Sequence, residues 1–266
     1  SRRRAHRPMT DWVPITGPLG GRRRPGSGPR LVLLHGFTQT GRSWQPVIDL
    51  LPDDIDVWCP DAPGHGDSRP TTANLETAAL LVVETVGCAR WVGYSMGGRT
   101  ALRAALDHPE AVESLVLIGA TAGIDDPAER ARRVRDDEAL ARSLETDGID
   151  HFLGQWLAGP LFASLSTEAA NMEDRRRNEA AGLAASLRSM GTGRQEPLWS
   201  RLHEGRCSLR FVAGGRDEKF TSIGERLTAT WGGPSQMTIV PDVGHAVHLE
   251  CPGIVASMLA SMLRDD

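Results

Sequence analysis

A serine in a glycine-rich turn is the first feature of this sequence that could carry out chemistry. The segment Gly93-Tyr94-Ser95-Met96-Gly97-Gly98 matches the pattern G-x-S-x-G, follows an apolar run and opens a stretch with helical spacing. In a strand–turn–helix context, this pattern presents its serine at the tip of a sharp turn where glycines avoid clashes. We therefore expect Ser95 to be a catalytic serine in a strained conformation above a helix N-terminus.

A serine hydroxyl is a poor base or nucleophile at neutral pH unless a histidine and a carboxylate assist it. In a turn of this kind the chain order is serine, acid, histidine. His245 follows the last expected strand and Asp217 follows the strand before it, so they are the expected partners. His248 is the rival histidine, for which we expect a structural or cap-contacting role. Three other carboxylates remain as alternatives for the acid: Asp125, Asp126 and Asp242.

Other groups near these motifs could assist catalysis. The backbone N–H groups of Phe37, after the His-Gly turn, and of Met96, after the serine, are the candidate oxyanion donors. His35 and His65 could serve as further bases, but their motifs shape loops, so we expect structural roles. No His, Cys or Asp cluster has metal-ligand spacing and no Gly-rich phosphate loop follows a strand, so we expect chemistry without a metal or cofactor.

Composition narrows the class of partner. The formal net charge is −4 and the pI about 6.1, which disfavours a nucleic-acid partner because phosphate binding calls for a basic surface. Apolar runs are all shorter than the roughly 20 residues of a membrane span, so none is expected. The basic segment 1–7 lacks the apolar stretch of a secretory signal, and we assign it no function. We expect a cytoplasmic protein that binds a small molecule, and its oligomeric state stays open.

Two further expectations concern cysteines and arginines. The four cysteines are far apart and mostly lie in or beside apolar runs, which favours free, buried thiols in a reducing cytoplasm. Arg22-Arg23-Arg24 lies in a Gly- and Pro-rich stretch, 17–29, and is expected to form a solvated turn. The four cysteines are Cys59, Cys88, Cys207 and Cys251.

Short apolar runs alternate with helical patterns along the chain, which indicates an α/β fold with a mostly parallel sheet covered on both faces. The expected strands are 31–34, 57–59, 91–93, 115–118, 209–212 and 237–240. The expected helices are 73–86, 96–107, 222–231 and 252–264.

Residues 123–204 interrupt this alternation. They are rich in Ala, Arg, Glu and Leu and contain no convincing strand. Because they follow a strand end, where open α/β sheets bind ligands, we expect a helical cap over a pocket. The predicted division is a core of residues 1–122 and 205–266 with a cap insertion at 123–204.

Arg99 offers a first indication of the substrate. It lies four residues after Ser95, so the two share a helix face and the guanidinium can line the pocket floor. This position suggests an anionic substrate. The alternative, an arginine paired with a nearby carboxylate, stays open.

Seven segments together are similar to the 2-succinyl-6-hydroxy-2,4-cyclohexadiene-1-carboxylate synthases of menaquinone biosynthesis, a family with the α/β-hydrolase fold. The extension of the serine motif to Arg99, the Trp156 segment and Asp217-Glu218-Lys219-Phe220 discriminate best, whereas Leu157-Ala158-Gly159 and Asp125 depart from the family pattern. The segments are His35–Thr38, Gly41–Trp44, Gly93–Arg99, Phe152–Trp156 with Pro160–Phe162, Gly191–Gly193, Asp217–Phe220 and Gly244–His248.

The resemblance implies a carbon–oxygen lyase that eliminates pyruvate from 2-succinyl-5-enolpyruvyl-6-hydroxy-3-cyclohexene-1-carboxylate. Ser95 would remove the ring proton with the help of His245 and Asp217. The substrate contacts that it implies include the only tyrosine and the only lysine of the chain: Tyr94, Arg99, Arg133, Trp156 and Lys219.

Two alternatives to the lyase remain. A serine carboxylesterase or C–C bond hydrolase of the same fold would form an acyl-enzyme and cleave nitrophenyl esters. A non-catalytic receptor would keep the pocket without using the triad, although the presence of Ser95, Asp217 and His245 argues against it.

Overall fold

The computed structural model describes residues 12–264, which form a sheet of eight strands in the order β1-β2-β4-β3-β5-β6-β7-β8. β1 and β2 are antiparallel to their neighbours, and the other strands are parallel. This arrangement confirms the expected fold class. The strands are β1 (Val13–Pro14), β2 (Gly21–Arg24), β3 (Arg30–Leu34), β4 (Asp56–Pro60), β5 (Ala89–Tyr94), β6 (Val112–Ile118), β7 (Ser208–Gly214) and β8 (Ser235–Val240).

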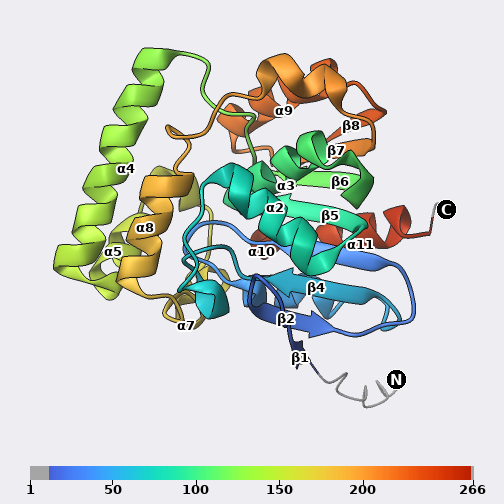
Figure 1. The fold of residues 1–266 in the computed structure, drawn as a ribbon, viewed down its shortest axis with the longest axis horizontal. Coiled ribbons are helices and arrows are strands. Elements are labelled where there is room, and N and C mark those ends of the chain that lie inside the picture. Colours follow the sequence, from blue (N-terminus) through green and yellow to red (C-terminus); the bar gives the residue numbers. More distant parts are fainter. Residues whose placement is uncertain (1–11, 265–266) are drawn as a thin grey trace.

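Helices cover both faces of the sheet (Figure 1). α2 and α3 pack together on one face, and α1, α10 and α11 pack on the other. The helices are α1 (Gln45–Ile48), α2 (Leu75–Val86), α3 (Met96–Asp107), α4 (Pro127–Asp147), α5 (Ile149–Leu157), α6 (Thr167–Ala170), α7 (Met172–Arg175), α8 (Ala180–Met190), α9 (Glu218–Thr230), α10 (Val247–Glu250) and α11 (Pro252–Met262).

The central strands β3, β5 and β6 are largely buried on both sides because helices cover both faces of the sheet. In β3, Val32 and Leu34 join the core cluster under α2 and α3, while Leu31 and Leu33 join the cluster under α1 and α11. Successive side chains of a strand point to opposite faces, so a continuous apolar run fills two cores at once. This two-sided burial fixes the strand ends that carry the site.

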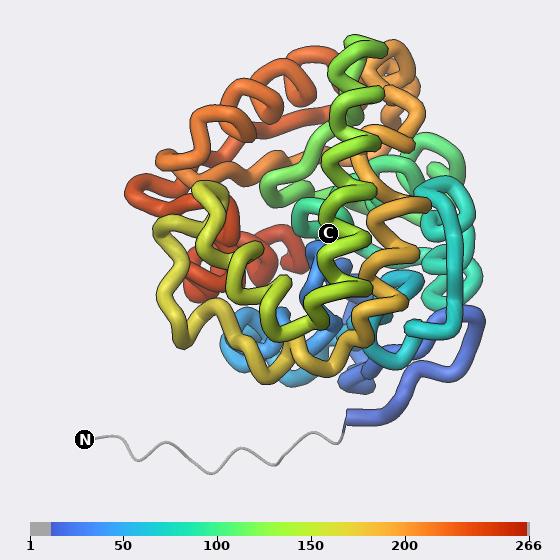
Figure 2. Tube along the Cα trace, turned by 90° about the vertical axis from the view of Figure 1, so that its left-hand side faces the viewer, coloured from blue at the N-terminus to red at the C-terminus, as the bar shows by residue number. Residues whose placement is uncertain are grey.

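Between β6 and β7 the described chain forms only helices, beginning with α4 and including α8. α4 and α8 lie side by side and stand off one end of the sheet (Figures 1 and 2). They bury their own apolar cluster, which includes Leu144, Phe152 and Leu183. Leu198 and Leu202 then join the main core, so the chain returns to the core before β7. No helix within residues 12–264 is long and apolar enough to cross a membrane.

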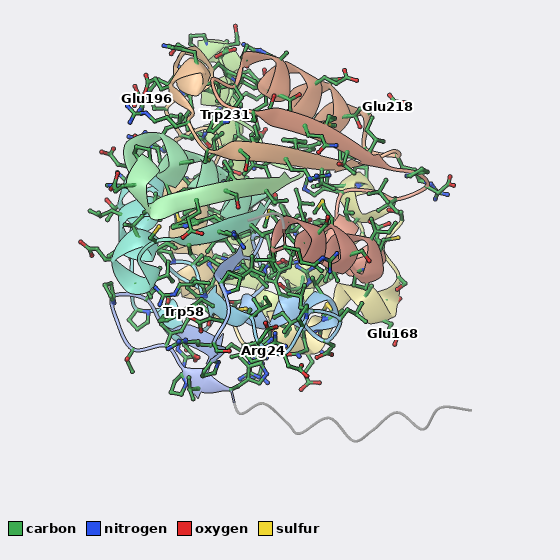
Figure 3. The ribbon with its side chains drawn as sticks, turned by 90° about the vertical axis from the view of Figure 1, so that its right-hand side faces the viewer. Arg24, Trp58, Glu168, Glu196, Glu218 and Trp231 are labelled. Carbon is green, nitrogen blue, oxygen red and sulfur yellow. The ribbon has the colours of Figure 1, made fainter. Side chains whose placement is uncertain are left out.

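The expectation of a solvated turn at Arg22–Arg24 was wrong, because these residues form β2, paired antiparallel with β4. Arg24 is 3% exposed, and its guanidinium donates to Pro52 O at 2.7 Å. Arg23 and Trp58 are opposite one another, and Figure 3 labels Arg24 and Trp58 toward this end of the molecule. In β2, arginine side chains packed on the rings of Trp12 and Trp58 take the place of the apolar residues by which a strand is usually predicted.

Two smaller expectations also need correction. The helix expected at 222–231 begins earlier, because Asp217 caps α9 by accepting from Phe220 N at 3.3 Å. All four cysteines are free, but only Cys59 is buried, and Cys88 is exposed. The basic segment 1–7 lies outside the described residues.

Asp56 anchors the β2–β4 pairing. Its carboxylate accepts from Arg23 Nε at 2.6 Å, Trp58 Nε1 at 3.0 Å and Arg30 Nε at 3.2 Å. Burial opposes the charged form, but these hydrogen bonds outweigh it and hold the pKa of Asp56 below its ordinary value. The carboxylate thus stabilises this side of the sheet as an anion.

We therefore predict that Asp56→Asn lowers the free energy of unfolding by about 1.5–3 kcal/mol at pH 7, the range for hydrogen bonds to charged groups. Because the folded pKa is depressed, the contribution is present above the unfolded pKa and is lost as pH falls through the folded value. Urea unfolding at pH 7 and in acid measures it. Equal stability of the two proteins at pH 7 would contradict the assignment.

Candidate active site

Ser95 lies at the end of β5 in a conformation that few side chains adopt. Its φ is 51° and its ψ is −108°, and α3 begins at the next residue. The Ser95 N–H donates to Ile118 O on β6 at 2.9 Å, which ties the turn to the neighbouring strand. This is the strained turn that the sequence pattern predicts.

The glycines of the motif are required by close backbone approaches. A Cβ on Gly93 would collide with Gly97 O, and one on Gly97 would collide with Leu34 O. At Gly98 a Cβ would lie 2.5 Å from the Cβ of Ala120. These contacts let α3 start directly against the ends of β3 and β5, so Ser95 is held between them.

His245 and Asp217 lie on two adjacent loops at the same edge of the sheet. His245 Nδ1 and Asp217 Oδ2 are 2.7 Å apart, and both side chains are buried. With Nδ1 donating to the carboxylate, Nε2 is left as the acceptor nitrogen. That Nε2 is buried and has no hydrogen-bond partner among the described residues. The alternative acids Asp125, Asp126 and Asp242 make other contacts.

The two carboxylate oxygens of Asp217 have different partners. Oδ1 caps α9 through Phe220 N, while Oδ2 accepts from His245. Backbone hydrogen bonds hold the two loops together: Arg216 N donates to Val243 O at 2.9 Å. The carboxylate is therefore fixed in position before any ligand binds.

Ser95 and His245 line a single cavity of about 180 Å³, which limits its occupant to a small molecule. The cavity lies between the strand ends and the helical segment that follows β6. Nine of the ten predicted site residues line it, and Asp217 stands behind His245. The nine are Phe37, Tyr94, Ser95, Met96, Arg99, Arg133, Trp156, Lys219 and His245.

Both candidate oxyanion donors, Phe37 and Met96, belong to this lining. Neither backbone N–H donates a hydrogen bond to another described residue. Two N–H groups beside the serine can therefore stabilise negative charge that develops on a ligand oxygen.

Arg99 is 7% exposed, and its guanidinium faces neutral acceptors. It donates to Met190 O at 2.8 Å and to Gln195 Oε1 at 3.1 Å. Among residues 12–264 no carboxylate oxygen lies within 4 Å of it, although the negative charge of Asp137 acts on it from farther away. Burial and the charge of Arg133 lower the pKa of Arg99 to about 10, so it remains a cation at neutral pH.

Arg133, on α4, is only half-buried. Its Nε donates to Asp137 Oδ1 at 2.8 Å, which leaves its terminal nitrogens for other partners. Burial raises the pKa of Asp137 even though Arg133 and Arg99 lower it. The neighbouring arginines Arg132 and Arg135 are exposed.

The sequence analysis did not identify Arg175 as a site residue. Arg175 is 2% exposed and lines the cavity, whereas Arg176 and Arg177 are exposed. Its guanidinium donates to Ala170 O at 2.8 Å and to Thr38 Oγ1. Three consecutive arginines, of which only Arg175 belongs to α7, carry no sequence signal that separates the buried one from its neighbours.

Aromatic rings form the remaining wall. Trp156 lies against Phe37, with ring centroids 5.3 Å apart, and its buried Nε1 has no acceptor among the described residues. Tyr94 is buried with its ring 5.3 Å from that of His245, and burial raises the pKa of its phenol. Lys219 is exposed at the rim and makes no ion pair with Asp217 in the described structure.

The other histidines lie outside this cavity lining. His35 Nε2 accepts from Ala62 N at 2.9 Å, and burial lowers the pKa of His65 to about 3. His248 is fully buried between Trp44 and Tyr94, with ring centroids at 4.6 and 4.2 Å. Their contacts fit the structural roles expected for them.

The His245–Asp217 pair predicts the reactivity of Ser95. Replacing Asp217 by Asn removes the charge that fixes the tautomer of His245, so covalent labelling of Ser95 by a fluorophosphonate should slow by at least about 100-fold. Asp242→Asn is the matched control, because Asp242 is an exposed residue of the loop that carries His245. In this variant, Ser95 should be labelled at the normal rate. Equal labelling of the two variants would exclude Asp217 as the acid.

Comparisons with known proteins agree with this geometry. The model of the alpha/beta hydrolase family matches residues 31–258. A protein of Enterobacter sp. (strain 638) named 2-succinyl-6-hydroxy-2,4-cyclohexadiene-1-carboxylate synthase is 34% identical over 256 residues, covering 92% of this chain and 96% of the relative. A Bacillus subtilis (strain 168) protein that bears the same name provisionally is 35% identical over 252 residues, covering 90% of this chain and 92% of that protein.

Among solved structures, MenH from S. aureus superimposes with a TM-score of 0.85 at 29% identity, covering 91% of this chain and 97% of that chain. A thermophilic esterase from Thermogutta terrifontis superimposes with a TM-score of 0.77 at 22% identity, covering 96% of this chain and 98% of the esterase. The second similarity concerns the fold alone.

Proposed function

The chain belongs to the alpha/beta hydrolase family, and we propose that it is a 2-succinyl-6-hydroxy-2,4-cyclohexadiene-1-carboxylate synthase. The reaction eliminates pyruvate from 2-succinyl-5-enolpyruvyl-6-hydroxy-3-cyclohexene-1-carboxylate, which makes the protein a carbon–oxygen lyase of menaquinone biosynthesis. Relatives with this name cover most of the chain at 34–35% identity. The observation that carries the proposal is Arg99, a buried cation with only neutral partners in the cavity that contains Ser95.

A buried cation is costly unless something compensates its charge. Arg99, Arg133 and Arg175 all line the cavity, with Lys219 at its rim. Asp137 compensates Arg133, but no ion pair of Arg99 or Arg175 occurs in the described part of the chain. A substrate with several carboxylates would supply the missing negative charge, whereas a neutral ester would leave the arginines uncompensated.

The proposed chemistry uses Ser95 as a base. His245 Nε2 accepts the Ser95 hydroxyl proton as Ser95 Oγ takes the proton from the ring carbon, while Asp217 stabilises the imidazolium. The electron pair of the broken C–H bond forms a C=C bond at ring position 2. The ring C=C bond shifts from position 3 to position 4, and the C–O bond between C5 and the enolpyruvyl group breaks. The departing enolate takes up a proton to become pyruvate. No acyl-enzyme forms.

The cavity wall contains hydrogen-bond donors that could stabilise the negative charge developing on the substrate during proton removal. The backbone N–H groups of Phe37 and Met96 can donate to it. Tyr94, kept neutral by its buried position, and the indole N–H of Trp156 are further donors on the same wall. We propose that the arginines bind carboxylates and that these donors act on the reacting ring.

We also propose the division into a core of residues 1–122 and 205–266 and a cap at 123–204, although Leu198 and Leu202 at the end of the cap segment pack in the main core. The separate apolar cluster of α4, α5 and α8 supports this division. Arg133, Trp156 and Arg175 would then come from the cap, and Ser95, Asp217 and His245 from the core. We place the reaction in the cytoplasm, where the four free cysteines stay reduced.

The first experiment tests the reaction itself. The enolpyruvyl cyclohexene substrate and nitrophenyl acetate are given to the enzyme in parallel, and diene absorbance and pyruvate are followed. We expect fast diene formation with stoichiometric pyruvate and negligible ester cleavage. Ser95→Ala should lower kcat by at least about 1000-fold without loss of folding. Ester turnover without diene would instead identify a serine hydrolase.

Arg99→Ala tests recognition of the anionic substrate. We expect kcat/KM to fall by an amount equivalent to about 2–5 kcal/mol, because a buried charge contact with the substrate is lost. Arg132→Ala, an exposed arginine on α4, is the matched control and should leave kcat/KM unchanged. A normal kcat/KM in the folded Arg99→Ala protein would assign Arg99 a purely structural role.

A further inference from the structure

Glu250, at the end of α10, contacts the loop that carries His245. Its Oε2 accepts from Gly244 N at 3.1 Å. Gly244 immediately precedes His245 in the chain. A Cβ built on Gly244 would lie 3.2 Å from the other oxygen, Oε1, so both carboxylate oxygens face this residue.

The rest of the histidine loop is held by backbone contacts. Gly215 N donates to Val240 O at 2.8 Å, and Arg216 N donates to Val243 O at 2.9 Å. Within the described chain, Glu250 provides the only side-chain hydrogen bond to the backbone of residues 241–246. The contact is made at the residue whose backbone determines where the imidazole of His245 lies.

Gly244 is confined on its other sides. A Cβ there would collide with Ser164 Oγ, and a Cβ on Gly214 would collide with Gly244 O. The loop therefore lies between the end of β7, the helical segment containing Ser164 and the carboxylate of Glu250. Loss of the carboxylate would leave one side of this enclosure open.

We propose that Glu250 is a positioning residue, which fixes the His245 loop by accepting a hydrogen bond from the Gly244 N–H. The inference rests on the proposed role of His245 as the partner of Ser95. Glu250 does not line the substrate cavity, so it acts on kcat through His245 and leaves substrate binding unchanged.

A second cavity makes the inference testable by chemical rescue. Glu250 lines a space of about 580 Å³ together with Glu168, Ser43 and Cys251. Replacing Glu250 by Ala would open the place of its carboxylate to this space. A small carboxylate such as formate could then enter and accept from Gly244 N–H.

The experiment compares Glu250→Ala, Glu250→Gln and Glu168→Ala. Glu168 is an exposed residue of the same cavity, labelled in Figure 3, and serves as the control. We expect Glu250→Ala to lower kcat by about 100-fold, the cost of a misplacement of about 1 Å, with KM within about 2-fold of wild type. Glu250→Gln keeps an acceptor oxygen and should retain kcat within about 3-fold, as should Glu168→Ala. Formate should restore kcat of Glu250→Ala in a saturable manner.

A measurement without substrate separates this inference from the proposed reaction. The downfield proton resonance of His245 Nδ1–H should be lost or broadened in Glu250→Ala and restored by formate or by Gln. Unchanged kcat and resonance in a folded Glu250→Ala protein would overturn the inference, as would a rise in KM alone or a Gln variant as impaired as Ala. If wild type forms no diene, the resonance still decides the role of Glu250.

Discussion

The backbone conformation of Ser95 is the constraint on which the rest of the site depends. A non-glycine residue with φ near 51° is stable only where its surroundings enforce the conformation. Here the end of β3, the start of α3 and the neighbouring β6 meet at the turn, and glycine is needed wherever their backbones approach most closely. The serine is thus presented by packing that extends through both cores of the sheet.

The charged side chains of the site differ in whether the protein itself compensates their charge. Asp217 is bound on both oxygens, one to a helix start and one to His245, so its charge is committed within the protein. Arg99 and Arg175 are bound to neutral oxygens, so their positive charge remains available to a ligand. The cavity combines a histidine whose ring is oriented by Asp217 with several fixed cations. That combination suits proton removal from an anionic molecule, and low polarity around it strengthens each contact.

The sequence predicted the parts of this molecule that have local signals. The apolar strands, the Ser95 turn and the positions of Asp217 and His245 after successive strands all follow from motifs or from alternating patterns. Strand β2 was missed because its three arginines are buried through stacking and hydrogen bonds that only the tertiary structure supplies. Arg175 was missed for a related reason, since burial distinguishes it from Arg176 and composition does not. The hydrogen bond from Arg99 to Gln195 could not be predicted either, because Gln195 is distant from Arg99 in the sequence.

The edge of the sheet beside the arginine-rich strand is short. A sheet edge with free N–H and C=O groups can pair with the edge of another molecule and start aggregation. At this edge β1 has only two residues, and one of them, Pro14, has no N–H to donate. On the adjoining β2, Arg23 is paired with Asp56, so its charge is compensated within the protein. Within the described chain, this edge therefore offers another strand few backbone groups for pairing.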